Sequence, residues 1–321
     1  MDADSLFKYF NAEPLVKKSA ELPNQGRKVL LFSDSRQKAA KLALDMSETS
    51  QRAATRQLLA LAIKYLNNES ASINLDNIYG YYLKAIYEKG TRNILVDDDQ
   101  KEYSKVVRKI DKGKTLDKKF KLDKASDFVK ESILRLYCSP YNNYYDTAIS
   151  WLEPTEDSLE DFIDNLEDED IEISSNYKNY LKEVLTIWMM LICTNYMALG
   201  SSISDTLRLK IGEYADKGLK ESELENLPGI IRGALKKVGV REDRIEDFID
   251  TLKEDYLSKS HTGEWYLKLD AIKPCLDLEH TWYFCKKCLQ VVPFNIDEKC
   301  PYCELGELHE LSDKLLENLD Y

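Results

Sequence analysis

A β-strand that leads directly into an α-helix is predicted by the stretch Arg27-Lys-Val-Leu-Leu-Phe-Ser-Asp-Ser-Arg-Gln37, which continues as Lys38-Ala-Ala-Lys-Leu-Ala-Leu-Asp-Met46. Val29 to Phe32 is a short apolar run, typical of a buried strand in a parallel sheet. The polar residues that follow can cap a helix, with Asp34 at the cap and Gln37 three residues later. Such a junction leaves backbone N–H groups free to bind phosphate.

The residues at this strand–helix junction also resemble a motif of a known protein family. The string Phe32-Ser-Asp-Ser-Arg-Gln37, followed by Lys38-Ala-Ala40, resembles the opening of the second RecA-like domain in a group of superfamily 2 DNA helicases. This group includes the mitomycin-repair helicases and the helicase subunit of the DISARM antiphage system. The resemblance implies that the unit is helicase motif IV, beside the nucleic-acid backbone and the cleft between two motor domains. The alternative is a strand–turn–helix unit of an unrelated α/β domain. By resemblance, the candidates for contacts with nucleic acid or with the rest of the motor are Ser33, Asp34, Ser35, Arg36 and Gln37.

Three motifs that an ATP-driven motor needs are absent from the sequence. There is no Gly-x-x-x-x-Gly-Lys-Ser/Thr loop for a triphosphate, no Asp-Glu-x-His box for Mg²⁺, and no Gln-x-x-Gly-Arg motif with an arginine finger. We therefore expect no catalytic residues here and no ATPase activity from this chain alone, with ATP and Mg²⁺ bound only in the complete motor. The chain reads as a piece of a motor whose partners are DNA and either the remaining helicase sequence or partner subunits.

Two Cys-x-x-Cys pairs near the C-terminus predict a structural zinc site. Cys285-Lys-Lys-Cys288 and Cys300-Pro-Tyr-Cys303 are separated by eleven residues, and four thiolates can surround one Zn²⁺ tetrahedrally. A redox dithiol is the competing interpretation. It would need only one such pair, and it would need a thioredoxin-like βαβ setting, which the sequence lacks. Short strands are expected around the pairs, which makes the segment a zinc ribbon: Trp265–Leu269, Trp282–Phe284 and Val291–Phe294.

Details of the ribbon extend the resemblance. In the same helicase group a helical insertion follows motif IV, and a Trp-Tyr-x-Cys-x-x-Cys…Cys-Pro-x-Cys ribbon follows the insertion. Glu304 stands where many ribbons have a glycine, and Gly306 is expected to serve that turn instead. His280 and His309 are reserve ligands only.

The middle of the chain reads as almost continuous helices, because apolar residues recur at helical spacing. The segment Tyr177–Leu199 has the widest apolar stripe and should be buried on most sides. The other expected helices are Ala53–Leu66, Ile78–Tyr87, Phe128–Tyr137, Ser204–Tyr214, Ser222–Val238 and Asp243–Leu257.

Two charged blocks lie within this helical region. Lys101 to Lys124 is rich in basic residues, and Lys105, Arg108 and Lys109 are candidates for phosphate contacts. The alternative is a solvated helix face followed by a loop, since aromatic residues for base stacking are sparse. Glu153 to Glu172 is acidic, and an amphipathic helix with an acidic loop is favoured over a dock for a basic partner.

Composition limits the class of protein. The 321 residues are 43% hydrophobic and 32% charged, with a formal net charge of −12, which argues against a protein that coats nucleic acid over its whole surface. The longest apolar run, Val184–Cys193, is too short to span a bilayer, and no secretion signal is visible. Seven cysteines with four in metal-ligand spacing fit a reducing, cytoplasmic environment. We expect Cys138, Cys193 and Cys275 to be unpaired, with Cys193 buried.

The resulting prediction is a mainly α protein: a strand–helix unit resembling motif IV (1–46), a helical insertion domain (47–258) and a zinc ribbon with a C-terminal helix (259–321). The predicted function is part of an ATP-dependent DNA helicase or translocase that shapes the DNA path or subunit contacts. The alternative is a non-catalytic, zinc-stapled protein–protein adaptor.

Overall fold

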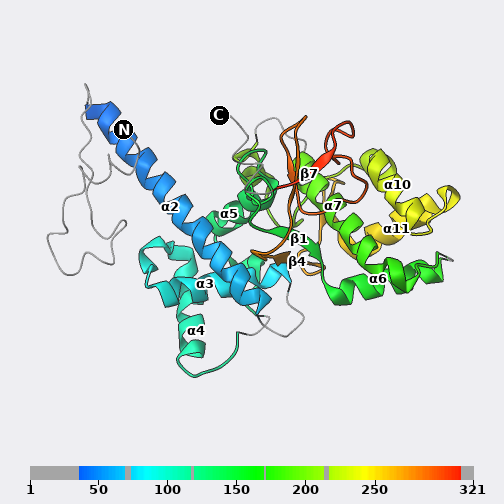
Figure 1. Ribbon diagram of the computed structural model, residues 1–321. Coiled ribbons are helices and arrows are strands. Elements are labelled where there is room, and N and C mark those ends of the chain that lie inside the picture. The colour runs from blue at the N-terminus through cyan, green and yellow to red at the C-terminus, as the bar shows by residue number, and fades with distance from the viewer. Residues whose placement is uncertain (1–35, 69–73, 117–118, 170, 213–216, 312–321) are drawn as a thin grey trace. The chain divides into compact units, whose positions relative to one another are not determined.

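The computed structural model describes residues 36–68, 74–116, 119–169, 171–212 and 217–311, with side chains from Thr49 onward. The architecture is mainly helical with small antiparallel sheets (Figure 1). A cluster of four cysteines lies near the C-terminus, as predicted. The expected strand Val29–Phe32 lies outside the described residues. The chain divides into two units, the first made of residues 1–62 and 79–120 and the second of residues 63–78 and 121–321. The predicted three-domain boundaries stay a prediction.

The first unit is helical. Its elements are α2 (Arg36–Asn67, up to residue 62), α3 (Ile78–Lys89), η4 (Arg92–Ile94), η5 (Asp97–Asp99) and α4 (Gln100–Ile110). One apolar stripe from each long helix is buried, including Leu59, Leu83 and Val106. The buried Tyr79 hydroxyl donates a hydrogen bond of 2.7 Å to Asp99, so this carboxylate is satisfied inside the unit.

The second unit is built around α7 (Lys178–Tyr196), whose side chains from Val184 to Cys193 are all buried. This helix packs against α5, α10 and the strand β1. Helices α6 and α11 pack through Phe162 and Phe248, whose ring centroids are 5.4 Å apart. The remaining helical elements of the unit are η3 (Leu75–Asn77), η6 (Leu122–Lys124), α5 (Asp127–Cys138), α6 (Glu156–Asp168), η7 (Ser175–Tyr177), α8 (Asp205–Leu209), α9 (Glu221–Glu225), α10 (Gly229–Lys237), η8 (Glu242–Arg244) and α11 (Ile245–Tyr256).

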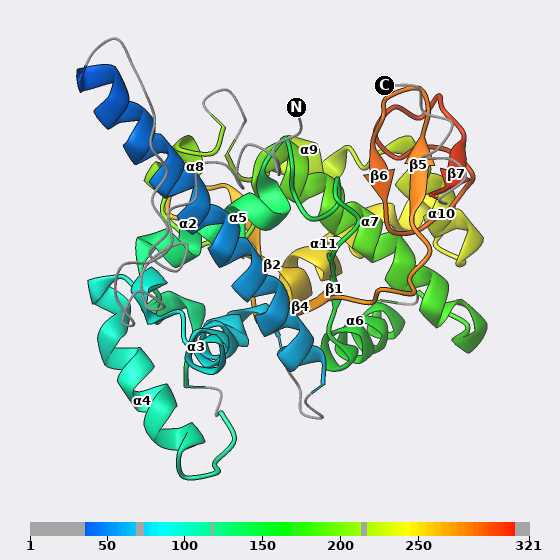
Figure 2. The ribbon, with the colours of Figure 1, turned by 60° about the vertical axis from the view of Figure 1, so that its left-hand side comes forward.

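Three small antiparallel sheets complete the described part of the second unit. Strand β1 (Trp151–Pro154) pairs with β4 (Ile272–Cys275), and β2 (Leu257–Lys259) pairs with β3 (Trp265–Leu267). The third sheet has the order β6-β5-β7, formed by Val291–Val292, Tyr283–Cys285 and Leu308–Glu310. Figure 2 shows these three strands side by side. The third sheet carries the cysteine cluster, so its position decides where the candidate site lies.

Several element boundaries differ from the sequence-based expectations. The helix expected over Ser222–Val238 is two helices, α9 and α10, because Pro228 restricts the residue before it and caps the second helix. The helix expected from Ser204 ends at Leu209 among the described residues. The acidic block is an amphipathic helix as favoured, but α6 begins at Glu156, since the preceding residues pair in β1.

A fully buried arginine, which the sequence did not single out, holds the connection between α7 and α8. The Arg208 guanidinium donates to the backbone carbonyls of Met197 (2.5 Å), Leu199 (3.0 Å), Gly200 (2.6 Å) and Ile203 (3.2 Å). Its guanidinium carbon also lies 4.3 Å from the ring centroid of Tyr266. The charge is therefore surrounded by carbonyl dipoles and an aromatic face, which offset the cost of its burial.

Candidate metal centre

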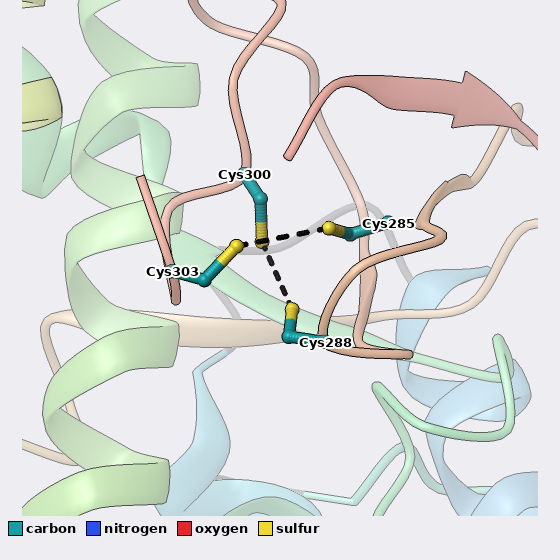
Figure 3. A group of neighbouring side chains, drawn as sticks. All are labelled: Cys285, Cys288, Cys300 and Cys303. Atoms are coloured by element: carbon teal, nitrogen blue, oxygen red, sulfur yellow. Dashed lines mark hydrogen bonds between the residues drawn. The ribbon is translucent and has the colours of Figure 1, made fainter. Parts of the chain in front are cut away.

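Four cysteine side chains converge at one point of the third sheet. The Sγ atoms of Cys285, Cys288, Cys300 and Cys303 all lie within 4.8 Å of one another (Figure 3). The Cys285–Cys303 and Cys288–Cys300 sulfur distances are 3.8 and 3.4 Å. Four sulfurs at about 2.3 Å from a tetrahedral ion are about 3.8 Å apart. The donor set and its spacing therefore fit a metal ion with four thiolate ligands.

Each Cys-x-x-Cys pair forms the same kind of backbone turn. The N–H of Leu289 donates to the carbonyl of Cys285, and that of Glu304 donates to the carbonyl of Cys300, both at 2.8 Å. The two turns end with Leu289 at φ 62° and Glu304 at φ 52°, in the left-handed region that non-glycine residues rarely adopt. This repeated geometry aims both cysteines of a pair toward one point.

Gly306 has a different role from the expected one. Glu304 itself takes the left-handed conformation, so Gly306 does not replace a glycine in that turn. A Cβ atom built at Gly306 would lie 2.4 Å from the Sγ of Cys285, which is closer than atoms can approach. The carbonyl of Gly306 also accepts a hydrogen bond of 2.8 Å from the N–H of Cys300. A side chain at this position would displace a cysteine of the cluster.

The environment of the four thiols is uneven. Cys285 and Cys300 are buried, whereas Cys288 and Cys303 are half-buried. Burial raises the pKa of the Cys288 and Cys300 thiols. The backbone N–H of Leu305 lowers the pKa of the Cys303 thiol to about 7, against a smaller opposing effect of burial. Metal binding requires thiolates, and a positive ion among the sulfurs favours their ionised form.

Side chains from the helices tether the ribbon, which is defined here as residues 283–310. The Tyr180 hydroxyl on α7 donates to the carbonyl of Ile296 at 2.5 Å. Tyr302, between the last two cysteines, places its hydroxyl 3.4 Å from Oγ1 of Thr194, also on α7. Lys237 on α10 forms an ion pair with Asp297 in the loop between the two cysteine pairs. The ribbon is therefore docked on α7 and α10 within the second unit.

An aromatic group that the sequence did not reveal packs where the chain enters the ribbon. The ring of His280 stacks on Trp151 at 4.2 Å between centroids, and both lie against Trp282 and Phe294. His280 Nε2 is 2.7 Å from the carbonyl oxygen of Pro293. The grouped metal-ligand atoms come from the four cysteines, so His280 and His309 are not members of the cluster. In the sequence, the Trp282-Tyr283 pair before Cys285 was the only hint of this aromatic group. Trp151 could not be assigned to it, because it lies far away in the sequence.

The other predicted site residues lie elsewhere. Lys105 and Arg108 are exposed on α4, and Lys109 Nζ lies 5.4 Å from the ring centroid of Phe120. Arg36 and Gln37 begin α2, but their side chains lie outside the description, as do Ser33, Asp34 and Ser35 altogether. None of these residues is brought together with the cysteine cluster by the described contacts. Their proposed contacts therefore stay predictions.

The three remaining cysteines are unpaired, as predicted. Cys138 and Cys193 are fully buried, and Cys275 is half-buried on β4. Burial raises the pKa of the Cys193 thiol, so this side chain is a packing residue of α7. Across the described residues, no helix combines the length and the apolar character needed to cross a membrane.

Comparison with known proteins gives one informative similarity. No family model matches the chain, and no solved structure matches it. The chain is 26% identical over 297 residues to the Druantia protein DruE of Escherichia coli (strain UMEA 4076-1). The match covers 88% of this chain but 15% of DruE. The chain is thus distantly similar to one part of DruE, and it spans only a small share of that protein's length.

Proposed function

We propose that this chain is a module of an ATP-dependent DNA helicase or translocase that acts in defence. The observation that carries the proposal is the 26% identity to DruE over 88% of the chain. The helicase assignment is supported by the motif IV-like string of residues 32–37, followed in order by helices and a four-cysteine ribbon. The module comprises the start of the second motor domain (1–46), a helical insertion (47–258) and the ribbon domain (259–321).

Zinc is the ion that we propose for the four-cysteine cluster. Four thiolates suit Zn²⁺, and a set of four protein ligands leaves no position for a reacting water. Bound at Cys285, Cys288, Cys300 and Cys303, the ion would supply a structural cross-link and no chemistry. The tethers to α7 and α10 then hold the ribbon as a fixed surface, which suits a role in shaping the DNA path or in contacts with partner subunits.

The alternative function is a zinc-stapled adaptor that binds proteins. Its sequence basis was the helical surface together with the acidic block, and two acids of α6 in that block are already paired within the second unit. Glu156 lies 2.9 Å from Lys182, and Glu160 lies 2.9 Å from Lys178. These pairs support an amphipathic helix rather than an open acidic dock. The adaptor therefore becomes an outcome of the functional test rather than a second proposal.

ATP hydrolysis provides that test. We expect no turnover from the purified chain with or without DNA, because its sequence has no Walker A loop. The full-length parent protein, or the chain supplied with the missing motor sequence, is expected to hydrolyse ATP in a DNA-dependent way. Turnover by the chain alone, after removal of contaminating ATPases, would refute the assignment. A complete parent protein that lacks DNA-stimulated hydrolysis would favour the adaptor.

A further inference from the structure

The segment Lys101–Lys124 has a charge opposite to that of the chain. It holds ten Lys or Arg and four Asp or Glu, a net charge of +6 in a chain of net charge −12. Such segregation concentrates positive potential in one region while the remaining surface is acidic. The helix α4 (Figure 2) begins this segment and spaces its basic residues regularly.

Basic side chains form a stripe along the exposed side of α4. Lys101, Lys105 and Arg108 are spaced four and three residues apart on α4, and Lys112 follows in the turn two residues after the helix ends. All four are exposed, whereas Tyr103 and Val106 on the opposite side are buried in the first unit. At 1.5 Å of rise per residue, successive charges lie about 4.5 to 6 Å apart along the axis. We name these four residues the basic stripe.

Two of the acidic groups next to the stripe engage one of its members or another partner, while Asp97 and Asp98 are exposed just before α4. Glu102 pairs with Lys105 at 2.5 Å between Oε1 and Nζ. Asp111, at the end of the helix, accepts a hydrogen bond of 2.8 Å from the Tyr87 hydroxyl. Lys109 points over Phe120, to the side of the stripe. Among the described residues, Lys101, Arg108 and Lys112 form no ion pair, so three of the four stripe cations are open to an added anion.

We propose that the basic stripe of α4 contacts the phosphodiester backbone of a nucleic acid. Exposed cations along a helix and in the turn that follows it suit a row of phosphates, and contacts of this kind position a nucleic acid without reading its bases. The inference rests on the proposed function, because it assigns the surface through which the module meets the nucleic acid of the motor. It keeps Lys105 and Arg108 of the candidates from the sequence, and it replaces Lys109 by Lys101 and Lys112.

The test measures binding of the purified chain to fluorescent oligothymidylate over a salt series. The stripe variant carries Lys101→Gln, Arg108→Gln and Lys112→Gln, which keep helix propensity and leave the Glu102–Lys105 pair intact. The control variant carries Lys64→Gln, Lys89→Gln and Lys210→Gln, three exposed lysines outside the stripe with the same change in charge. The stripe variant is expected to lower the salt slope of log K by about 2, since each phosphate contact on a single strand contributes about 0.7. The control is expected to keep most of the slope.

The outcomes separate the possible partners. If the stripe variant lowers the salt slope for oligouridylate as much as for oligothymidylate, the stripe contacts the phosphate backbone alone. If it lowers the slope for oligothymidylate only, the stripe belongs to a path specific for DNA. Equal losses in the stripe and control variants overturn the stripe and leave the proposed motor function standing, since that function is judged by ATP hydrolysis of the complete protein. Stripe-dependent binding of polyglutamate without binding of either nucleic acid would assign the stripe to an acidic protein and overturn the proposal.

Discussion

Arg208 shows how one side chain can organise a connection from the inside. Its guanidinium satisfies four backbone carbonyls between Met197 and Ile203, and its side chain is fully buried. The connection it holds also joins the β2–β3 sheet, because the N–H of Gly200 donates to the carbonyl of Leu267. Loss of the guanidinium would remove these four hydrogen bonds from the middle of the second unit.

Arg208→Met is therefore expected to lower the free energy of unfolding by about 3 kcal/mol or more, because the methionine fills part of the space but donates no hydrogen bonds. Urea denaturation followed by circular dichroism measures this change. Arg241→Met is the control, since the Arg241 side chain is 70% exposed and its pair with Asp243 contributes less than about 1 kcal/mol. Similar stabilities of the two variants would contradict the structural role of Arg208.

Glu153 gives the second unit a pH-dependent contribution. Burial alone would raise the pKa of this carboxyl, but Lys182 at 2.8 Å, the Trp151 indole N–H at 2.9 Å and Lys273 at 3.3 Å together lower it. A carboxyl whose pKa is lower in the folded state stabilises the protein above the pKa of the unfolded chain, about 4.3. This stabilisation is lost as the pH falls through the folded-state pKa.

Glu153→Gln is expected to lower the free energy of unfolding by about 2 kcal/mol at neutral pH, since it removes a buried charge between two lysines. The difference from the unaltered protein should shrink as the pH falls below about 4, where Glu153 itself becomes neutral. Glu160→Gln, which removes an exposed partner of Lys178, should show little effect at any pH. A difference between Glu153→Gln and the unaltered protein that stays constant from neutral to acidic pH would exclude this linkage.

Single residues differ in how far the sequence predicts them. The four cysteines were predictable because their spacing reflects the local turns that aim the sulfurs at one point. The need for glycine at position 306 was not predictable, because it depends on contact with Cys285 on β5, far away in the sequence. The burial of Arg208 could not be predicted either, because nothing in the sequence distinguishes it from the other charged residues. Its carbonyl partners come together only in the folded chain.

At the scale of elements, local periodicity predicted the helices and failed for long-range pairing. The apolar pattern over Tyr177–Leu199 correctly predicted α7 and its burial, because a wide apolar surface must be covered from several sides. Strand β1 was missed, since its partner β4 lies more than a hundred residues away and both strands contain a proline. A four-residue strand has too little sequence pattern to identify such a partner.

The ribbon is the element whose stability depends most on the proposed metal. Its strands have two or three residues each, so the sheet buries too little apolar surface to be stable by itself. The tethers from Tyr180, Thr194 and Lys237 reach the ribbon from helices that have their own core. These helices should therefore keep their packing when the ribbon opens, while the tethers themselves are lost.

At the scale of the whole molecule, the two units make the effect of metal removal separable. The first unit has its own buried stripes and contains no residue of the cysteine cluster. In the second unit, α6 and α11 pack through aromatic contacts that do not involve the ribbon. Loss of the metal should thus be local in the second unit and without effect on the core of the first.

We expect one zinc ion per chain in freshly prepared protein, and none in Cys288→Ser combined with Cys300→Ser, because two of the four ligands are then missing. Elemental analysis measures the metal, and hydrogen exchange should show loss of protection in β5, β6 and β7 with protection retained in α3, α4, α6 and α11. Cys275→Ser is the matched control, since Cys275 lies outside the cluster, and it should retain the zinc. Unchanged zinc in the double variant would exclude this ligand set. Loss of protection throughout α6 and α11 would instead show that the ribbon supports the fold of the entire second unit, because a local staple cannot unfold helices that pack on each other.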